Sequence, residues 1–403
     1  MKLTHREKYV FKNSEVGLIP EDWNSSELSN TIIELTDFVA AGSFESLRNN
    51  VTVYEGHEYA FYVRLYDIRL GLGHKNQKYV DKKSYDFLKR SNLNGDEVLI
   101  ANIGANVGET FLMPKVNQPA TIAPNMIVIR TDKKKLLPSY LLYYSKSDIG
   151  REKLFELISG SGHPKVNKTD LKKLFLLLPP LKEQEAIAEA LSDADDLIRS
   201  LDALIEKKQA IKNGTMQQLL TGKKRLPGFS GEWEVKRLGD LLTVMHGKSQ
   251  KTVENAYGQY PILATSGVIG KAYQFLYDKP SVLIGRKGTI NKPQYMDSPF
   301  WTIDTLFYTQ VKKPALAKFL YYKFLMINWE SYNEASGVPS LNSSTIENIE
   351  IVIPNNIKEQ QSIVKLLDDL NHEIQALQQK RDKYKQIKQG MMQELLTGKT
   401  RLI

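Results

Sequence analysis

The sequence predicts an α+β protein. It has two globular α/β-mixed domains separated by two long antiparallel coiled-coil helices, with a pseudo-two-fold internal repeat. Three observations predict this fold: a repeated segment, an apolar seam in each copy of the segment, and a change of charge along each seam. The chain has 403 residues, which is enough for several domains at about 100–200 residues each.

The repeated segment is about 45 residues long. The tripeptide "KEQ" at 182–184 recurs at 358–360, an offset of 176 residues (358 − 182), and the same offset carries "LLTGK" at 219–223 onto 395–399. Shorter matches lie upstream: Gly162, Pro164 and Asn167 match Gly337, Pro339 and Asn342, and Pro20 and Trp23 match Pro227 and Trp233. The chain is therefore two units in tandem, each with a mixed domain followed by a long helical segment.

The helical segments are expected at 179–226 and 355–403, which leaves mixed domains at 1–178 and 227–354. Pro179-Pro180 and Pro354 mark their starts, and Gly222 and Gly398 are candidate C-caps. Apolar residues recur at steps of four and three, which makes one narrow seam per helix. The seam residues for a coiled coil or for partner docking are Ile187, Leu191, Ile198, Leu201, Ile363, Leu367, Leu370, Ile374 and Leu377. Two amphipathic helices on separate cores are the alternative.

Charge favours an antiparallel pair, because both helical segments begin acidic and end basic. Antiparallel packing sets opposite charges side by side, and it also brings together the two helix ends that the domain at 227–354 connects. A helix of about 40 residues is about 60 Å long, and half-sites on one face of duplex DNA lie about 34–36 Å apart or at multiples of that distance. Such a rod could hold two DNA-reading domains over separate grooves.

Composition limits the partners and the compartment. The formal net charge of +9 favours nucleic acid, and the absence of cysteine excludes disulfides and thiolate zinc sites. No stretch reaches the roughly 18 apolar residues that a membrane span needs, and the charged N-terminus has no signal-peptide core. We therefore expect a cytoplasmic protein with no membrane partner.

Polar loops are the candidate DNA-binding surface. Both mixed domains alternate short apolar runs with turns, and the turns are rich in basic and amide side chains, which contact phosphates and base edges. The candidate residues are Lys75, Asn76, Gln77, Lys78, Asn102, Asn106, Lys165, Lys248, Arg286, Lys287, Asn291 and Lys292. A solvated turn is the alternative for any one of them.

The sequence lacks the motifs of common catalytic and cofactor sites. "VLIANIGANVG" does not have the glycine spacing of a dinucleotide site, and "SGVIGKAY" fails the P-loop pattern at Thr265 and Ala272. The six histidines form no metal-binding spacing. We expect no catalytic residue, no metal and no cofactor in this chain.

The long helical stretches carry a family resemblance. "LPPLKEQEAIAEALSDADDLIRSL", "QQLLTGKKRLPGF" and "QELLTGKTRL", together with "FKNSEVGLIPEDW" and "GEWEVKRLGDLL", resemble the specificity subunits of Type I restriction-modification systems over essentially the whole chain. The resemblance implies two target recognition domains that each read one half of a bipartite, asymmetric site in double-stranded DNA. It implies helices that set the spacer and dock two modification (methyltransferase) subunits.

The resemblance also implies restriction subunits with translocase and nuclease activity. S-adenosylmethionine would bind the modification subunit, and ATP and Mg²⁺ the restriction subunit.

Two other classes of function stay open. A self-sufficient methyltransferase or nuclease with its own recognition domain is disfavoured by the missing cofactor motifs. A scaffold that assembles other proteins without DNA contact is disfavoured by the basic, loop-rich domains.

Overall fold

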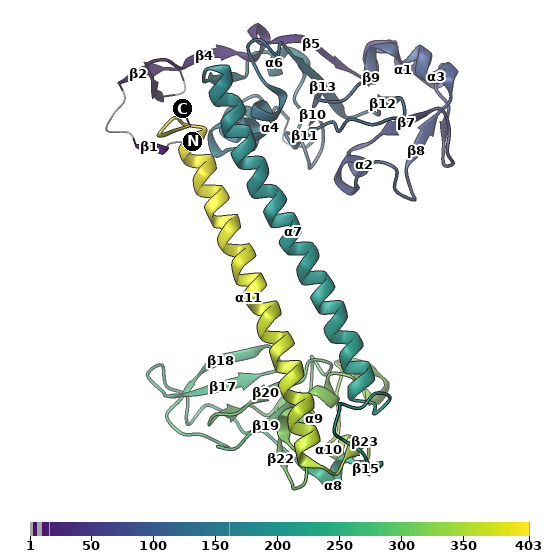
Figure 1. The fold of residues 1–403 in the computed structure, drawn as a ribbon, viewed down its shortest axis with the longest axis vertical. Coiled ribbons are helices and arrows are strands. Elements are labelled where there is room, and N and C mark those ends of the chain that lie inside the picture. The colour runs from purple at the N-terminus through teal and green to yellow at the C-terminus, as the bar shows by residue number, and fades with distance from the viewer. Residues whose placement is uncertain (1–2, 6–9, 16, 161, 403) are drawn as a thin grey trace. The chain divides into compact units, whose positions relative to one another are not determined.

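The computed structural model describes residues 3–5, 10–15, 17–160 and 162–402 (Figure 1). Ser161, in the polar loop "SGSGHPKVNK" that contains the candidate Lys165, lies outside the described residues. The chain forms two compact units: Met1–Ser200 with Arg381–Ile403, here the first unit, and Leu201–Lys380, here the second unit. Each unit contains one half of each long helix.

Two larger sheets build the first unit. The four-stranded antiparallel sheet has the order β11 (Thr110–Leu112), β10 (Val98–Ala101), β13 (Met126–Thr131), β5 (Ile32–Asp37). The five-stranded sheet has the order β6 (Val53–Tyr54), β8 (Lys78–Val80), β7 (Ala60–Val63), β12 (Ala120–Ile122), β9 (Asn92–Leu93), and only β7 and β12 pair in parallel.

Smaller elements complete the first unit. The two-stranded pairs are β1 (Leu3–His5) with β24 (Thr400–Leu402), β2 (Phe11–Ser14) with β3 (Gly17–Pro20), and β4 (Asn24–Glu27) with β14 (Phe175–Leu178). The helices are α1 (Phe44–Asn50), α2 (Leu65–Leu70), α3 (Lys82–Phe87), α4 (Pro138–Lys146), α5 (Asp148–Phe155) and α6 (Lys168–Leu171), with short 3₁₀ turns at Leu28–Asn30, Phe38–Ala41 and Lys89–Ser91.

The four-stranded sheet separates two cores in the first unit. Val98 and Ile100 of β10 face a core that includes Tyr140 of α4, whereas Leu99 between them faces the core under the five-stranded sheet. This alternation follows from the two-residue period of a strand and explains why β10 is apolar on both faces.

The second unit repeats this arrangement with fewer strands. Its four-stranded antiparallel sheet has the order β20 (Gln294–Met296), β19 (Ser281–Gly285), β22 (Leu306–Val311), β16 (Leu242–Met245), which follows the order of the first unit strand for strand. The other strands are β18 (Gly267–Ala272), β17 (Tyr260–Ala264) and β21 (Trp301–Thr302) in one sheet, and β15 (Trp233–Arg237) with β23 (Glu350–Pro354). The helices are α8 (Leu238–Leu241), α9 (Ala317–Phe324) and α10 (Ser343–Glu347), with a 3₁₀ turn at Trp329–Tyr332.

The long helices are α7 (Leu181–Leu219) and α11 (Ile357–Leu395), each of 39 residues. Both begin just after the predicted prolines. Gly222 and Gly398 follow the helix ends with φ of 73° and 69°, a left-handed conformation that suits glycine. No helix among the described residues has an apolar stretch that could span a membrane.

The two helices run antiparallel within each unit. In the second unit Lys208 lies 2.6 Å from Glu373, and Lys212 lies 3.0 Å from Asn371. The residue numbers of the contacts therefore increase along α7 and decrease along α11. In the first unit Lys388 Nζ lies 2.6 Å from Asp195 Oδ1. Among the seam residues, Leu370 and Leu377 are half-buried; the buried ones are Ile187, Leu191, Ile198, Leu201, Ile363, Leu367 and Ile374.

Candidate nucleic-acid interface

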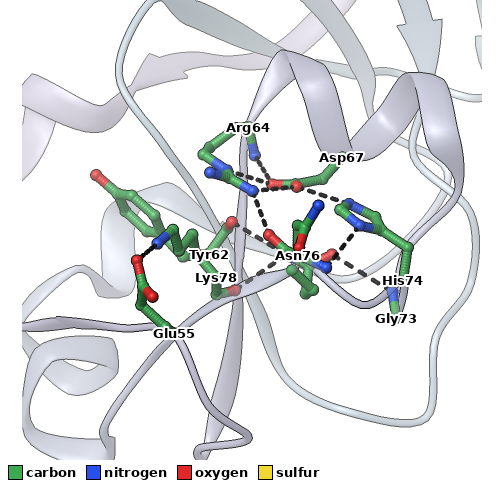
Figure 2. A network of polar contacts seen from close by, with 9 residues as sticks. Glu55, Tyr62, Arg64, Asp67, Gly73, His74, Asn76 and Lys78 are labelled. Carbon is green, nitrogen blue, oxygen red and sulfur yellow. Dashed lines mark hydrogen bonds and ion pairs between the residues drawn. The ribbon is translucent and has the colours of Figure 1, made fainter.

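The loop between α2 and β8 is held by a buried carboxylate (Figure 2). Asp67 is fully buried and accepts hydrogen bonds from Arg64 Nη2 at 2.6 Å, Arg64 Nε at 2.9 Å and His74 Nε2 at 2.9 Å. Burial alone would raise the pKa of Asp67, but the hydrogen bonds from Arg64 and His74 outweigh burial and lower it. Asp67 is therefore an anion at neutral pH that fixes both partners.

The same network positions the backbone of Asn76. His74 Nδ1 accepts the Asn76 N–H at 3.1 Å, and Arg64 Nη2 donates to the Asn76 carbonyl at 2.7 Å. His74 therefore donates from Nε2 and accepts at Nδ1, which is the pattern of a neutral imidazole. The side chains of Lys75 and Asn76 are left exposed on a pre-organised loop.

Gln77 and Lys78 differ from these two neighbours. Gln77 is only 1% exposed, and its amide donates to the carbonyls of Lys78 at 3.0 Å and Tyr62 at 3.3 Å. It thus supports the loop from inside. Lys78 is half-buried and forms an ion pair with the exposed Glu55, which partly neutralises it.

A second group of candidates meets where two loops cross in the first unit. The loop after β10 carries Asn102 and Asn106, and the Asn102 carbonyl accepts the N–H of Val166, next to Lys165, at 3.0 Å. Asn106 Oδ1 accepts from Arg69 of α2 at 2.9 Å, and Arg69 also pairs with Glu109. The structure therefore brings Asn102, Asn106 and Lys165 together, and Arg69 joins them to the helix that precedes Lys75.

In the second unit the candidates lie in loops at the ends of β16 and β19. Lys248 is exposed, and its carbonyl accepts Trp301 Nε1 at 2.9 Å. Asn291 donates to Glu330 Oε1 at 3.0 Å, and its neighbour Lys292 is exposed. Arg286 and Lys287 line a cavity of about 260 Å³, together with His246, Phe307, Glu334, Ser340, Leu341, Asn342 and Ser343.

Glu183 and Gln184 have a structural role that the sequence did not reveal, because there they served only as markers of the repeat. Glu183 accepts from Arg401 at 2.7 Å on both oxygens and from Trp23 Nε1 at 2.9 Å. Gln184 accepts the N–H of Leu137 at 2.9 Å and donates to the carbonyls of Lys135 at 2.9 Å and Pro179 at 3.0 Å. Both residues fix the direction in which α7 leaves the first unit.

The second unit contains the same pair of contacts. Glu359 binds Arg225 Nη2 at 2.7 Å, and Gln360 accepts from Leu316 at 2.9 Å and donates to Pro314 at 3.1 Å and Pro354 at 2.9 Å. Each arginine comes from the LLTGKxRL motif of the other repeat. The fixed spacing of KEQ and this motif in both repeats was the signal that could have revealed the pairing.

The two units have the same sheet order, polar loops at the strand ends and parts of a long helix pair, so the fold is that of a two-unit α+β protein. Residues 30–212 and 230–388 match the family described as the Type I restriction modification DNA specificity domain, and the chain belongs to this family. The match confirms the resemblance that the repeated helical motifs indicated.

Several relatives are similar over nearly their whole length. The Type I restriction enzyme MjaVIII specificity subunit of Methanocaldococcus jannaschii is 25% identical over 433 residues, covering 97% of this chain and 96% of the relative. The crystal structure of a Type I restriction-modification system S subunit from M. genitalium matches with a TM-score of 0.62 at 16% identity, covering 93% of this chain and 96% of that one. A structure described under complex assembly and conformational transition of the type I R-M system matches with a TM-score of 0.56 at 18% identity, covering 94% and 99%. These structures share the fold.

Proposed function

We propose that this chain is the DNA sequence-specificity subunit of a Type I restriction-modification complex. Its target recognition domains, at 1–178 and 227–354, each read one half of a bipartite, asymmetric site in double-stranded DNA. One observation carries the proposal. The four-stranded sheet has the same strand order in both units, and the polar loops at its strand ends make matching backbone hydrogen bonds but have different side chains. A shared backbone arrangement with different loop side chains suits two domains that read different half-sites.

The helices act as the spacer. The segments 179–226 and 355–403 form an antiparallel coiled coil around a pseudo-two-fold axis, supported by the antiparallel contacts within each unit and by the exchanged pairs Glu183–Arg401 and Glu359–Arg225. Helices of 39 residues are about 59 Å long, which suffices to separate two groove contacts. Two modification subunits dock along this pair, and Ile211 and Ile387, exposed to 44% and 42%, are equivalent apolar positions for such contacts.

Catalysis belongs to the partner subunits in this proposal. S-adenosylmethionine binds the modification subunits, and ATP and Mg²⁺ serve the restriction subunits. A self-sufficient enzyme would instead bind S-adenosylmethionine as an isolated chain, so calorimetry of the isolated chain with that cofactor separates the two hypotheses.

DNA binding tests the proposal against a scaffold role. The chain is co-purified with its modification subunit, and its affinity for duplex DNA is measured by fluorescence anisotropy at several salt concentrations. We expect binding that weakens steeply with salt, since lysine and arginine contacts displace counterions. The paired variant Lys75→Ala/Asn76→Ala should weaken binding, whereas Lys134→Ala, also exposed in the first unit, should not. An assembled complex with no salt-dependent DNA binding would establish the scaffold role instead.

A further inference from the structure

In the first unit the loop after β10 crosses the loop before α6, and backbone hydrogen bonds join the two loops. Asn102, the first residue after β10, donates its N–H to the Asn125 carbonyl at 3.1 Å and accepts the Val166 N–H at 3.0 Å. Two residues later, Gly104 donates its N–H to the Pro164 carbonyl at 2.9 Å. The loop after β10 is thereby pinned to the loop before α6.

The second unit contains the same crossing. Arg286, the first residue after β19, donates its N–H to the Thr305 carbonyl at 2.8 Å and accepts the Leu341 N–H at 2.9 Å. Two residues later, Gly288 donates its N–H to the Pro339 carbonyl at 2.8 Å.

The matching contacts make Asn102 and Arg286 equivalent positions. Gly104 and Gly288 agree further, with φ of 86° and 88°, a conformation that glycine adopts without strain. The equivalence is hidden in the sequence, because Asn102 and Arg286 are 184 residues apart (286 − 102) whereas Pro164 and Pro339 are 175 apart (339 − 164). No single offset aligns both loops.

The backbone groups at these two positions are already bonded, so only the side chains are left to contact a ligand. Asn102 Oδ1 is enclosed and accepts no hydrogen bond from any residue that the structure describes. The Arg286 guanidinium makes a long contact of 3.3 Å to the Asp304 carbonyl and lines the 260 Å³ cavity. An enclosed acceptor without a partner in the free protein suits a group that finds its partner on binding.

Each crossing also contains a lysine at a bridge position beside the central residue. Ile103 pairs with Lys165 in the first unit, and Lys287 pairs with Ser340 in the second. Either lysine can neutralise a phosphate whatever the base sequence. The amide of Asn102 has no charge to neutralise a phosphate, whereas its donor and acceptor together match a base edge, so the shared central position is better suited to a base.

We propose that positions 102 and 286 determine specificity in the two domains, with Asn102 pairing with an adenine and Arg286 with a guanine in the major groove. Asparagine presents a donor and an acceptor that match adenine N7 and N6, and arginine presents two donors that match guanine O6 and N7. This inference rests on the proposed function.

The test maps methylated bases across a genome by single-molecule sequencing, using the chain co-expressed with its modification subunit. The variants are Arg286→Asn, Arg286→Lys and Asn102→Arg. The control is Lys279→Asn, which removes one positive charge from an exposed site of the same unit as Arg286. Arg286→Lys keeps the charge and loses the two-pronged donor, so it decides the question if Arg286→Asn does not assemble.

We expect Arg286→Asn to lower the preference for guanine at one position of one half-site by about tenfold or more, with the other half-site unchanged. Asn102→Arg should alter one position in the other half-site, and Lys279→Asn should alter neither. The inference is overturned if methylation falls uniformly at all sites, if the motif is unchanged, or if the affected half-site contains no guanine. A wild-type complex that gives no bipartite motif contradicts the proposed function itself, before any variant is compared.

Discussion

Arg401 forms a two-pronged ion pair with Glu183, which precedes it by 218 residues, and both nitrogen–oxygen distances are 2.7 Å. Both side chains are 1% exposed. Asp22 binds the same guanidinium at 2.9 and 2.7 Å, and the Trp23 ring lies 5.6 Å away. The pair therefore ties the C-terminal strand β24 to the start of α7.

Removing this arginine should be costly. Arg401→Ala leaves the buried Glu183 without its cation, and breaking a buried pair in this way costs about 3–5 kcal/mol. Arg225→Ala should cost less, because Arg225 is 25% exposed whereas Arg401 is 1% exposed. Denaturant unfolding of the full chain measures both. Equal midpoints for Arg401→Ala and the parent protein would show that the pair does not hold the unit together.

Gln184 should control the start of α7. Gln184→Ala leaves the Leu137 N–H and the carbonyls of Lys135 and Pro179 without their partner, at about 1–3 kcal/mol for a buried group. We expect faster hydrogen exchange over 135–139 and 179–187, while the second unit is unchanged. Gln184→Glu is the matched control, since it keeps the acceptor for Leu137 and loses both donors. Unchanged exchange in both variants would mean that packing alone fixes the helix start.

The ion pair between Asp195 and Lys388 tests the antiparallel helix contact. Asp195→Lys places two cations together beside Tyr143, whose hydroxyl donates to Asp195 at 3.0 Å. We expect a loss of about 1–2 kcal/mol in stability, and Lys388→Asp in the same chain should restore most of it. The double-mutant cycle, measured by thermal unfolding at low salt, gives the coupling. A coupling near zero would place these side chains apart in solution.

Buried Lys323 should make the stability of the protein depend on pH. Burial lowers its pKa from 10.5 to about 8, and its ammonium donates to the carbonyl of Leu220, the residue after the end of α7, 2.8 Å away. Between these two pKa values the unfolded chain binds more protons than the folded chain, so stability rises with pH through this window. The full shift corresponds to an effect on the order of 3 kcal/mol.

The Lys323→Met variant isolates this effect. The free energy of unfolding is measured for both proteins at pH 7 and near pH 10.5. We expect the value for the parent protein minus the value for the variant to be larger at the higher pH. Lys279→Met, at an exposed lysine, provides the baseline. A difference that is flat across this range would place Lys323 in contact with water.

The sequence predicted the helices well because their signal is local. Steps of four and three, bounded by proline and glycine, mark α7 and α11 within a few residues, and the charge gradient along each helix favoured the antiparallel contacts that each unit shows. The strands β10 and β19 could also be identified, since short apolar runs before glycine loops are a local pattern.

The candidate site was harder to predict because its contacts are long-range. Asn102 meets Val166, and Arg286 meets Leu341, across separations that no sequence period connects. The amide of Gln77 made it a candidate for DNA binding. In the structure Gln77 is buried, and the same amide donates to two backbone carbonyls. His74 directly precedes the candidates Lys75 and Asn76, and only its contact with the buried carboxylate of Asp67 reveals its role.

We propose that two readers are held apart by a helical spacer, and methylation mapping of the co-expressed complex shows whether they are. We expect a bipartite, asymmetric motif with a fixed gap. Deleting residues 200–206 and the equivalent 376–382 shortens each helix by two turns, about 10 Å, and should shorten the gap by about three base pairs while both half-sites are kept. A continuous motif, or a gap that stays the same in the shortened protein, would rule out a helical spacer between two readers.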